Sequence, residues 1–184
     1  MARSNSNKRK LIDKVLTSFG LVATLALLSI GGLAWWAYSF TSSNVHDELT
    51  AQQIYFPPLG SPALASPKIG PYLNQYAGKQ LLTGPEAKAY ANHFIAVHLS
   101  EVADGKTYSQ VSAEAMANPT NVTYKAQQAV LFQGETLRGM LLGDAYAFAT
   151  IGQIARIAAL VCFIAGGVMA VLTLLGYWHL STLK

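Results

Sequence analysis

IAALVCFIAGGVMAVLTLLGYW, residues Ile157–Trp178, decides the fold of this chain. The stretch has no charged side chain. A helix needs about 20 residues to cross a hydrocarbon core about 30 Å thick, and this stretch is longer than that. Arg156 precedes it, and Tyr177 and Trp178 end it, where amphipathic rings suit lipid headgroups. We therefore predict a transmembrane helix over 157–178, followed by a short tail, 179–184.

A second apolar run lies near the N-terminus, at Val15–Phe40. Its basic front and apolar middle resemble a signal peptide, but the run is longer than a signal-peptide core and ends in aromatic rings such as Trp35 and Trp36, not in a small-residue cleavage site. We predict an uncleaved transmembrane helix over 15–40. A chain of 184 residues is too short to surround two such helices with a soluble core.

Charge is scarce and unevenly placed: 12% of the residues are charged, about half the share in an average soluble domain. The first 14 residues hold a basic cluster, which comprises Arg3, Lys8, Arg9, Lys10 and Lys14. This arm, 1–14, is expected to be disordered alone and to contact anionic lipid. Its charge places both termini in the cytoplasm of a two-pass plasma-membrane protein and residues 41–153 outside. The sequence has no basic stripe with interleaved aromatic residues, which is the pattern that would predict nucleic-acid binding.

The single cysteine, Cys162, lies within the second apolar run. It cannot form an intramolecular disulfide, so the extracytoplasmic part must be held by packing, by its anchors or by a partner. We interpret the thiol as a small apolar filler.

The segment between the apolar runs predicts a small, mostly helical domain. Residues 41–53 are expected to continue as a helix, and 54–56 to be extended. The proline-rich stretch 57–71 is predicted to be an irregular connector that contributes nothing to the core. Gly84-Pro85 opens a helix over 85–103, and Asp104-Gly105 ends it. Ser109 or Ser112 is the expected cap of a short helix that ends at Ala117.

No helix-breaking signal follows Asn121 until the C-terminus. The pattern predicts one long helix, or two nearly continuous ones, in which a membrane-proximal part, 121–153, leads into the second span. The fold class is therefore mainly α: two transmembrane helices flank a small helical extracytoplasmic domain.

Residues with metal-binding chemistry gather on the helix over 85–103. His93 and His98 are five residues apart, so their imidazoles point in different directions and cannot share a metal without other ligands. His98 and Glu101, at i and i+3, are on one face. We keep His93, His98 and Glu101 as weak metal candidates. No cofactor is predicted, because the chain has no Ser/His/Asp set, Gly-rich phosphate loop or Cys/His cluster.

Close-packing residues suggest surfaces for a neighbour. Gly139 and Gly143 in one part of the chain, Gly166 and Ala170 in the second span, and Gly31-Gly32 in the first all let helices approach closely. Two alternatives remain open: the two spans pack on one another there, or another membrane protein docks. Asp144, in an otherwise apolar run, is either solvated or contacts the rest of the domain or a second subunit.

Four short motifs carry a resemblance to a known family: Ala77–Lys79 (AGK), Thr83–Pro85 (TGP), Gly105–Tyr108 (GKTY) and the step Leu137-Arg138-Gly139. With their surroundings they cover about half of the chain, which resembles a family of small two-pass actinobacterial membrane proteins. Members of this family often carry the name aromatic ring-opening dioxygenase. The name conflicts with the residues, because a non-haem iron oxygenase needs two histidines and a carboxylate on one face of a pocket.

Similar small proteins are accessory subunits of the actinobacterial respiratory supercomplex, in which a cytochrome bcc unit joins an aa3 oxidase. The resemblance implies a non-catalytic accessory subunit that packs against larger integral membrane proteins, such as respiratory oxidase or cytochrome subunits. The connector 57–71 departs from the family pattern and is a candidate binding arm. The alternative is a self-standing envelope protein that binds a ligand or a metal through its extracytoplasmic domain.

Overall fold

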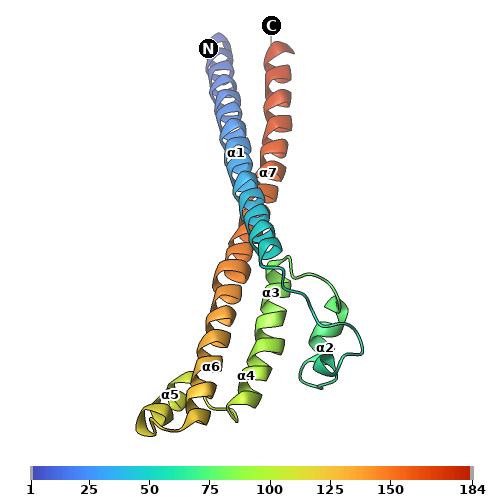
Figure 1. The fold of residues 1–184 in the computed structure, drawn as a ribbon. Coiled ribbons are helices and arrows are strands. Elements are labelled where there is room, and N and C mark those ends of the chain that lie inside the picture. Colours follow the sequence, from blue (N-terminus) through green and yellow to red (C-terminus); the bar gives the residue numbers. More distant parts are fainter. Residues whose placement is uncertain (1, 183–184) are drawn as a thin grey trace. The chain divides into compact units, whose positions relative to one another are not determined.

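The computed structural model describes residues 2–182, with the side chains of 2–7 left out. Within this range the regular structure is helical, and the only sheet-like pairing is an isolated bridge between Tyr55 and Gln80. The elements in chain order are α1 (Ala2–Gln52), η1 (Pro62–Leu64), α2 (Gly70–Leu73), η2 (Asn74–Tyr76), α3 (Gly84–Tyr90), η3 (Ala91–Ile95), α4 (Ala96–Val102), α5 (Tyr108–Ala117), α6 (Val122–Met140), η4 (Leu141–Ala147) and α7 (Phe148–Thr182) (Figure 1).

The chain divides into two compact units. The first, which we call the helical pair, holds Met1–Phe40 and Gly152–Lys184; the second, which we call the central unit, holds Thr41–Ile151. The long helices α1 and α7 each contribute to both units. Each unit is described by itself below.

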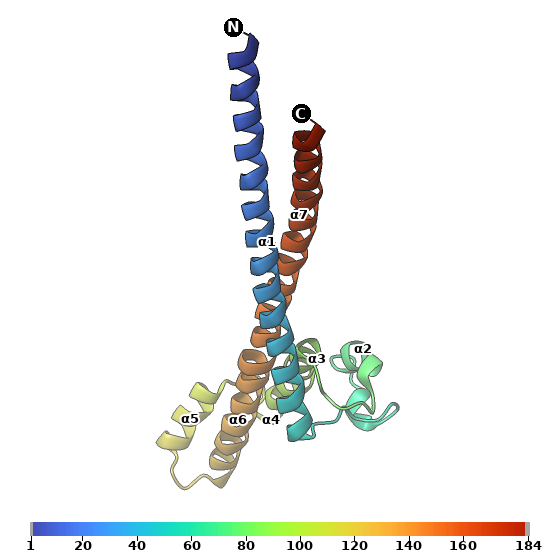
Figure 2. The same ribbon diagram turned by 90° about the horizontal axis from the view of Figure 1, so that it is seen from above.

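In the helical pair, α1 and α7 run antiparallel and lie side by side in both views (Figures 1 and 2). Small residues sit at the contacts, which set the register: Thr17 against Gly176, Gly20 against Thr173, Leu28 against Gly166 and Gly31 against Cys162. A Cβ atom on Gly20 would lie 2.6 Å from Thr173 Oγ1, and one on Gly176 would lie 2.7 Å from Thr17 Oγ1. Glycine therefore lets these two backbones approach at both places.

The helical pair exposes its large apolar side chains instead of covering them. Among the described residues, two helices are long and apolar enough to cross a membrane, Lys8–Gln52 and Val122–Thr182, and only 22% and 17% of their most apolar windows are buried within the chain. A core helix of a soluble protein would be mostly covered. The aromatic ends also resemble an interfacial belt, because the exposed Trp36 ring stacks on Phe40 and the Arg156 guanidinium lies 5.5 Å from the Tyr38 ring centroid.

The basic arm differs from the prediction of disorder. Helix α1 already begins at Ala2, so the backbone of 2–14 continues the first apolar helix; Met1 lies outside the described residues. The prediction that helix continues beyond residue 41 is confirmed, since α1 extends to Gln52. It ends where Gln53 adopts the left-handed conformation, with φ of 52°, which stops a helix even without glycine.

The central unit has a continuous apolar core to which almost every element contributes. The buried members are Val45, Leu49, Phe56, Leu64, Ile69, Leu73, Leu81, Ala87, Ala91, Ile95, Leu99, Ala103, Val111, Leu131, Leu141 and Ala145. Several are alanines, which allow the helices to approach closely. Gly84 and Gly134 serve the same purpose: a Cβ on Gly84 would lie 2.5 Å from Ala149 Cβ, and one on Gly134 would collide with the Leu99 side chain.

The proline-rich connector was wrongly predicted to lie outside the core. Its Leu64 and Ile69 are buried, and η1 and the start of α2 form within it. The connector closes a loop whose ends pair: Phe56 N–H donates to Lys79 O at 2.9 Å, and Leu81 N–H donates to Ile54 O at 2.9 Å. The extended piece predicted over 54–56 is therefore present. The connector that follows it returns to the central unit, where Leu64 and Ile69 are buried in the apolar core.

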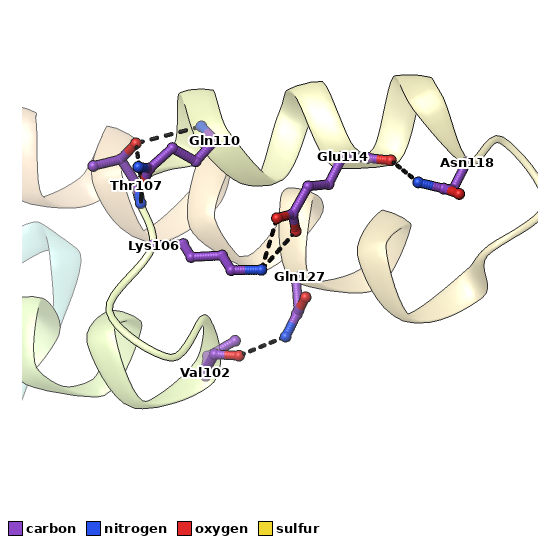
Figure 3. A network of polar contacts seen from close by, with 7 residues as sticks. All are labelled: Val102, Lys106, Thr107, Gln110, Glu114, Asn118 and Gln127. Atoms are coloured by element: carbon purple, nitrogen blue, oxygen red, sulfur yellow. Dashed lines mark hydrogen bonds and ion pairs between the residues drawn. The ribbon is translucent and has the colours of Figure 1, made fainter.

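Polar contacts surround both ends of helix α5 and the neighbouring α4 and α6 (Figure 3). The cap is Thr107, not the expected Ser109 or Ser112: Thr107 Oγ1 accepts from Gln110 N–H, and Gln110 Oε1 accepts from Thr107 N–H. Lys106 Nζ donates to Glu114 at 2.7 Å, and Gln127 Nε2 donates to Val102 O at 2.9 Å. The first of these two contacts joins the loop before α5 to α5 itself, and the second joins α6 to α4.

The long C-terminal helix is confirmed as a continuous run from Val122 to Thr182, with Asn121 as its cap. Its middle differs from a regular α-helix, because η4 is a π-helical segment over Leu141–Ala147. The helix predicted over 85–103 is also confirmed and also carries a π-helical segment, η3, over Ala91–Ile95. Such wide turns are rare and frequently lie at functional sites.

Candidate partner-binding surface

The predicted packing residues of the spans divide into covered and open positions. A Cβ on Gly31 would lie 2.9 Å from the Phe163 ring, and one on Gly166 would lie 2.9 Å from Leu28 Cδ2. Both glycines therefore lie at contacts between the chain's own two spans, which is the first of the two predicted alternatives. Ala170 is half-buried, and Gly32 is exposed with no atom within 4 Å of a Cβ placed there. Among the predicted packing residues of the spans, Gly32 is therefore the open one.

Gly139 and Gly143 are open as well. Both are exposed, and nothing lies within 4 Å of a Cβ placed on either. They are four residues apart on one helix, so they share a face. Thr136 and Ala147 extend this face and are also exposed. We call these four small residues the open glycine face, and note that the chain's described side chains leave it uncovered.

Asp144 lies beside the open glycine face, in a groove of about 280 Å³ within the central unit. The end of α1 forms the other wall, with Asn44, Glu48 and Gln52, while buried apolar residues such as Leu49 form part of the lining. We call this hollow the acidic groove, because Glu48 and Asp144 both line it. Among the described side chains, the ion pairs are Lys106–Glu114 and Arg138–Glu135, so neither groove carboxylate is paired with a cation.

The segment η4 places these groups. Leu141 and Ala145 are buried in the core, whereas Gly143 and Asp144 are exposed. A π-helical turn holds more residues than an α-helical turn, so it changes which side chains face the core at this point. The arrangement combines a flat, small-residue face with two unpaired carboxylates. Chemically, it is suited to a packed helix that carries a basic side chain.

The weak metal candidates are not brought together. His93 is half-buried and stacks on the Tyr72 ring, with centroids 3.7 Å apart, whereas His98 and Glu101 are exposed. Across residues 8–182, no three His, Cys, Asp or Glu side chains lie close enough to hold a metal ion.

A second polar cluster escaped the sequence reasoning. Lys88 Nζ donates to the Tyr146 hydroxyl at 3.0 Å and lies 4.4 Å from the centroid of that ring. This hydrogen bond and the lysine charge lower the pKa of the Tyr146 phenol from its ordinary value. The two residues are 58 positions apart, so no local pattern pairs them. Only the packing of α3 on η4 brings them together.

Comparisons of this chain with family models, with curated proteins and with solved structures gave no match.

Proposed function

We propose that this chain is a two-pass membrane protein that serves as a non-catalytic accessory subunit and docks on a larger integral membrane protein. The observation that carries the proposal is the open glycine face. Close-packing glycines that no part of the described chain covers are a surface for another helix. The uncovered apolar surface of the two long helices supports the same conclusion, because it suits lipid and protein contacts in a bilayer.

The acidic groove supports a partner with a basic side chain at this contact. Unpaired carboxylates next to a packing face favour a cation on the partner and disfavour a carboxylate. We place the central unit on the extracytoplasmic side and both termini in the cytoplasm, because basic residues precede the first span. The respiratory supercomplex is the partner that the sequence resemblance suggests.

Co-purification tests the docking surface. We expect the double variant Gly139→Leu and Gly143→Leu to fold but to lose its partner, since the added side chains block close approach of a helix. Ala126→Leu is the matched control, because Ala126 is an exposed small residue on α6 outside the open glycine face. Gentle detergent extraction, native gels and mass spectrometry of the co-purified proteins measure the loss. Equal partner recovery with the wild type and the double variant would contradict this surface.

Haem spectroscopy of the same native-gel bands tests the respiratory assignment. We expect the wild-type band to show haem absorption if the partner is a respiratory cytochrome or oxidase. Such haem would belong to the partner, since no cofactor is predicted for this chain. Migration as a free monomer without haem would remove the respiratory proposal, and a haem-free complex would retain the subunit role with another partner.

A further inference from the structure

A hollow of about 410 Å³ opens on the central unit and shares no lining residue with the open glycine face or the acidic groove. Three segments line it: α2 with η2, α3 with η3, and η4. The polar lining comprises Tyr72, Gln75, Lys88, His93 and Tyr146, and two prolines and an alanine complete it. No carboxylate lines this hollow, which distinguishes it from the acidic groove.

The lining is rich in hydrogen-bond donors. The lysine ammonium has three N–H donors and gives one to the Tyr146 hydroxyl. Gln75 has an amide NH₂ group, and the His93 ring and the Tyr146 hydroxyl each carry a donor. The ion pairs among residues 8–182 are Lys106–Glu114 and Arg138–Glu135, so the charge of Lys88 is not neutralised by a carboxylate there. The hollow therefore carries a positive charge at Lys88 and, although Gln75 Nε2 gives one donor to Tyr72 O, it keeps several donors and no carboxylate.

Two structural features characterise the lining: a pair of stacked rings, and a side chain from each π-helical segment. The Tyr72 and His93 rings stack almost parallel, with an interplanar angle of 6°. His93 belongs to η3 and Tyr146 to η4, so each π-helical segment contributes one side chain to the same hollow. Wide helical turns of this kind frequently lie at functional sites.

We propose that this hollow binds a phosphate-class oxyanion, with Lys88 as its charged contact. A tetrahedral oxyanion presents oxygens in several directions and so matches donors on three segments, whereas a carboxylate presents its oxygens in one plane. The anion is either free phosphate or the phosphomonoester headgroup of a lipid. This inference does not depend on the proposed partner, and it uses no residue of the open glycine face.

Calorimetric titration with inorganic phosphate tests the proposal. The full chain is held in phosphatidylcholine nanodiscs at constant ionic strength, and we expect saturable binding at one site. Lys88→Gln should weaken the affinity by about tenfold or more, because a charge-assisted hydrogen bond is lost. Lys88→Arg should restore most of it. Lys125→Gln is the matched control, since Lys125 is an exposed lysine outside the hollow, and it should bind like the wild type.

Nanodiscs that contain phosphatidic acid separate the two sources. If the headgroup is the ligand, the phosphatidic acid ³¹P resonance shifts with wild-type protein and not with Lys88→Gln. If free phosphate is the ligand, the resonance is unaffected and the phosphate titration persists. Absence of binding in both arms would overturn the proposal. So would equal weakening by Lys88→Gln and Lys125→Gln, which indicates general electrostatic attraction. Circular dichroism of Lys88→Gln checks that this variant is folded.

Discussion

Single glycines have two opposite roles in this protein, and the sequence alone does not separate them. Gly20, Gly31 and Gly166 face a neighbouring helix at distances that a side chain would violate, whereas Gly32 and Gly139 face open space. A glycine within a helix costs about 1 kcal/mol relative to alanine. At a covered glycine, the close packing that it permits offsets this cost. An open one has no such compensation within the described chain.

Gly20→Val is therefore expected to destabilise the helical pair by about 1–3 kcal/mol, because the new side chain overpacks against Thr173. Gly32→Val places the same side chain in the same apolar segment of α1 and should be neutral. Thermal unfolding in detergent, followed by tryptophan fluorescence, compares the two. Similar midpoints for both variants would show that the Gly20 contact does not form.

The contact of Lys88 with Tyr146 predicts a pH effect. The hydrogen bond from the ammonium favours the phenolate and lowers the phenol pKa, so Lys88→Met should raise the Tyr146 pKa towards its ordinary value of 10.0. Because the lowered pKa belongs to an acid, any stabilisation is present at alkaline pH and is lost as the pH falls through the folded-state pKa. The ¹³Cζ shift of labelled tyrosines, assigned with Tyr146→Phe, measures the change; Lys125→Met should leave it unaltered.

At the scale of the element, the clearest signals in the sequence predicted the helices correctly. Two uninterrupted apolar runs, and Gly84-Pro85 before a run with apolar residues on one face, coincide with α1, α7 and α3. The predictions failed where the decisive contact is distant in sequence. Leu64 and Ile69 of the connector are buried because other elements cover them, and no local signal in the sequence marked the π-helical segments η3 and η4. The Lys88–Tyr146 cluster was missed for the same reason.

The cap of α5 was misplaced by only a few residues, and substitution tests the correction. Thr107→Ala removes the hydroxyl that accepts from Gln110 N–H, although the Thr107 N–H can still donate to Gln110 Oε1, and should lower the free energy of unfolding by about 1 kcal/mol. Ser109→Ala should have almost no effect, because Ser109 is exposed and lies two residues inside the helix, after the cap. Chemical denaturation of the two variants in detergent gives the comparison, and an equal loss would contradict Thr107 as the cap.

At the scale of the whole molecule, chain order separates a membrane-suited pair from a compact central unit. The two spans come from opposite ends of the sequence, and the residues between them build their own core. Under the proposed orientation, in which the basic arm is cytoplasmic, this order would put the central unit outside.

Cysteine labelling tests this topology in a Cys162→Ala background. A thiol introduced by Thr120→Cys, at an exposed position of the central unit, should react with a membrane-impermeant maleimide on intact cells. A thiol introduced by Ser181→Cys should react only after the membrane is permeabilised. The reverse pattern would invert the orientation, and equal reactivity on intact cells would refute a two-pass arrangement.

The position of Cys162 opposite Gly31 has a practical consequence. The Cβ of Cys162 would lie 3.3 Å from a Cβ at position 31, slightly less than the separation usual in disulfide bonds, and the Phe163 ring, 2.9 Å from that Cβ, would have to move aside. Gly31→Cys therefore turns the native thiol into one half of a covalent lock between the spans, formed by a lipid-soluble oxidant. A bridge within one chain leaves the molecular mass unchanged on a non-reducing gel, whereas exchange of spans between copies doubles it. The native thiol therefore needs only one introduced cysteine to distinguish packing of the two spans within one chain from exchange of spans between two copies.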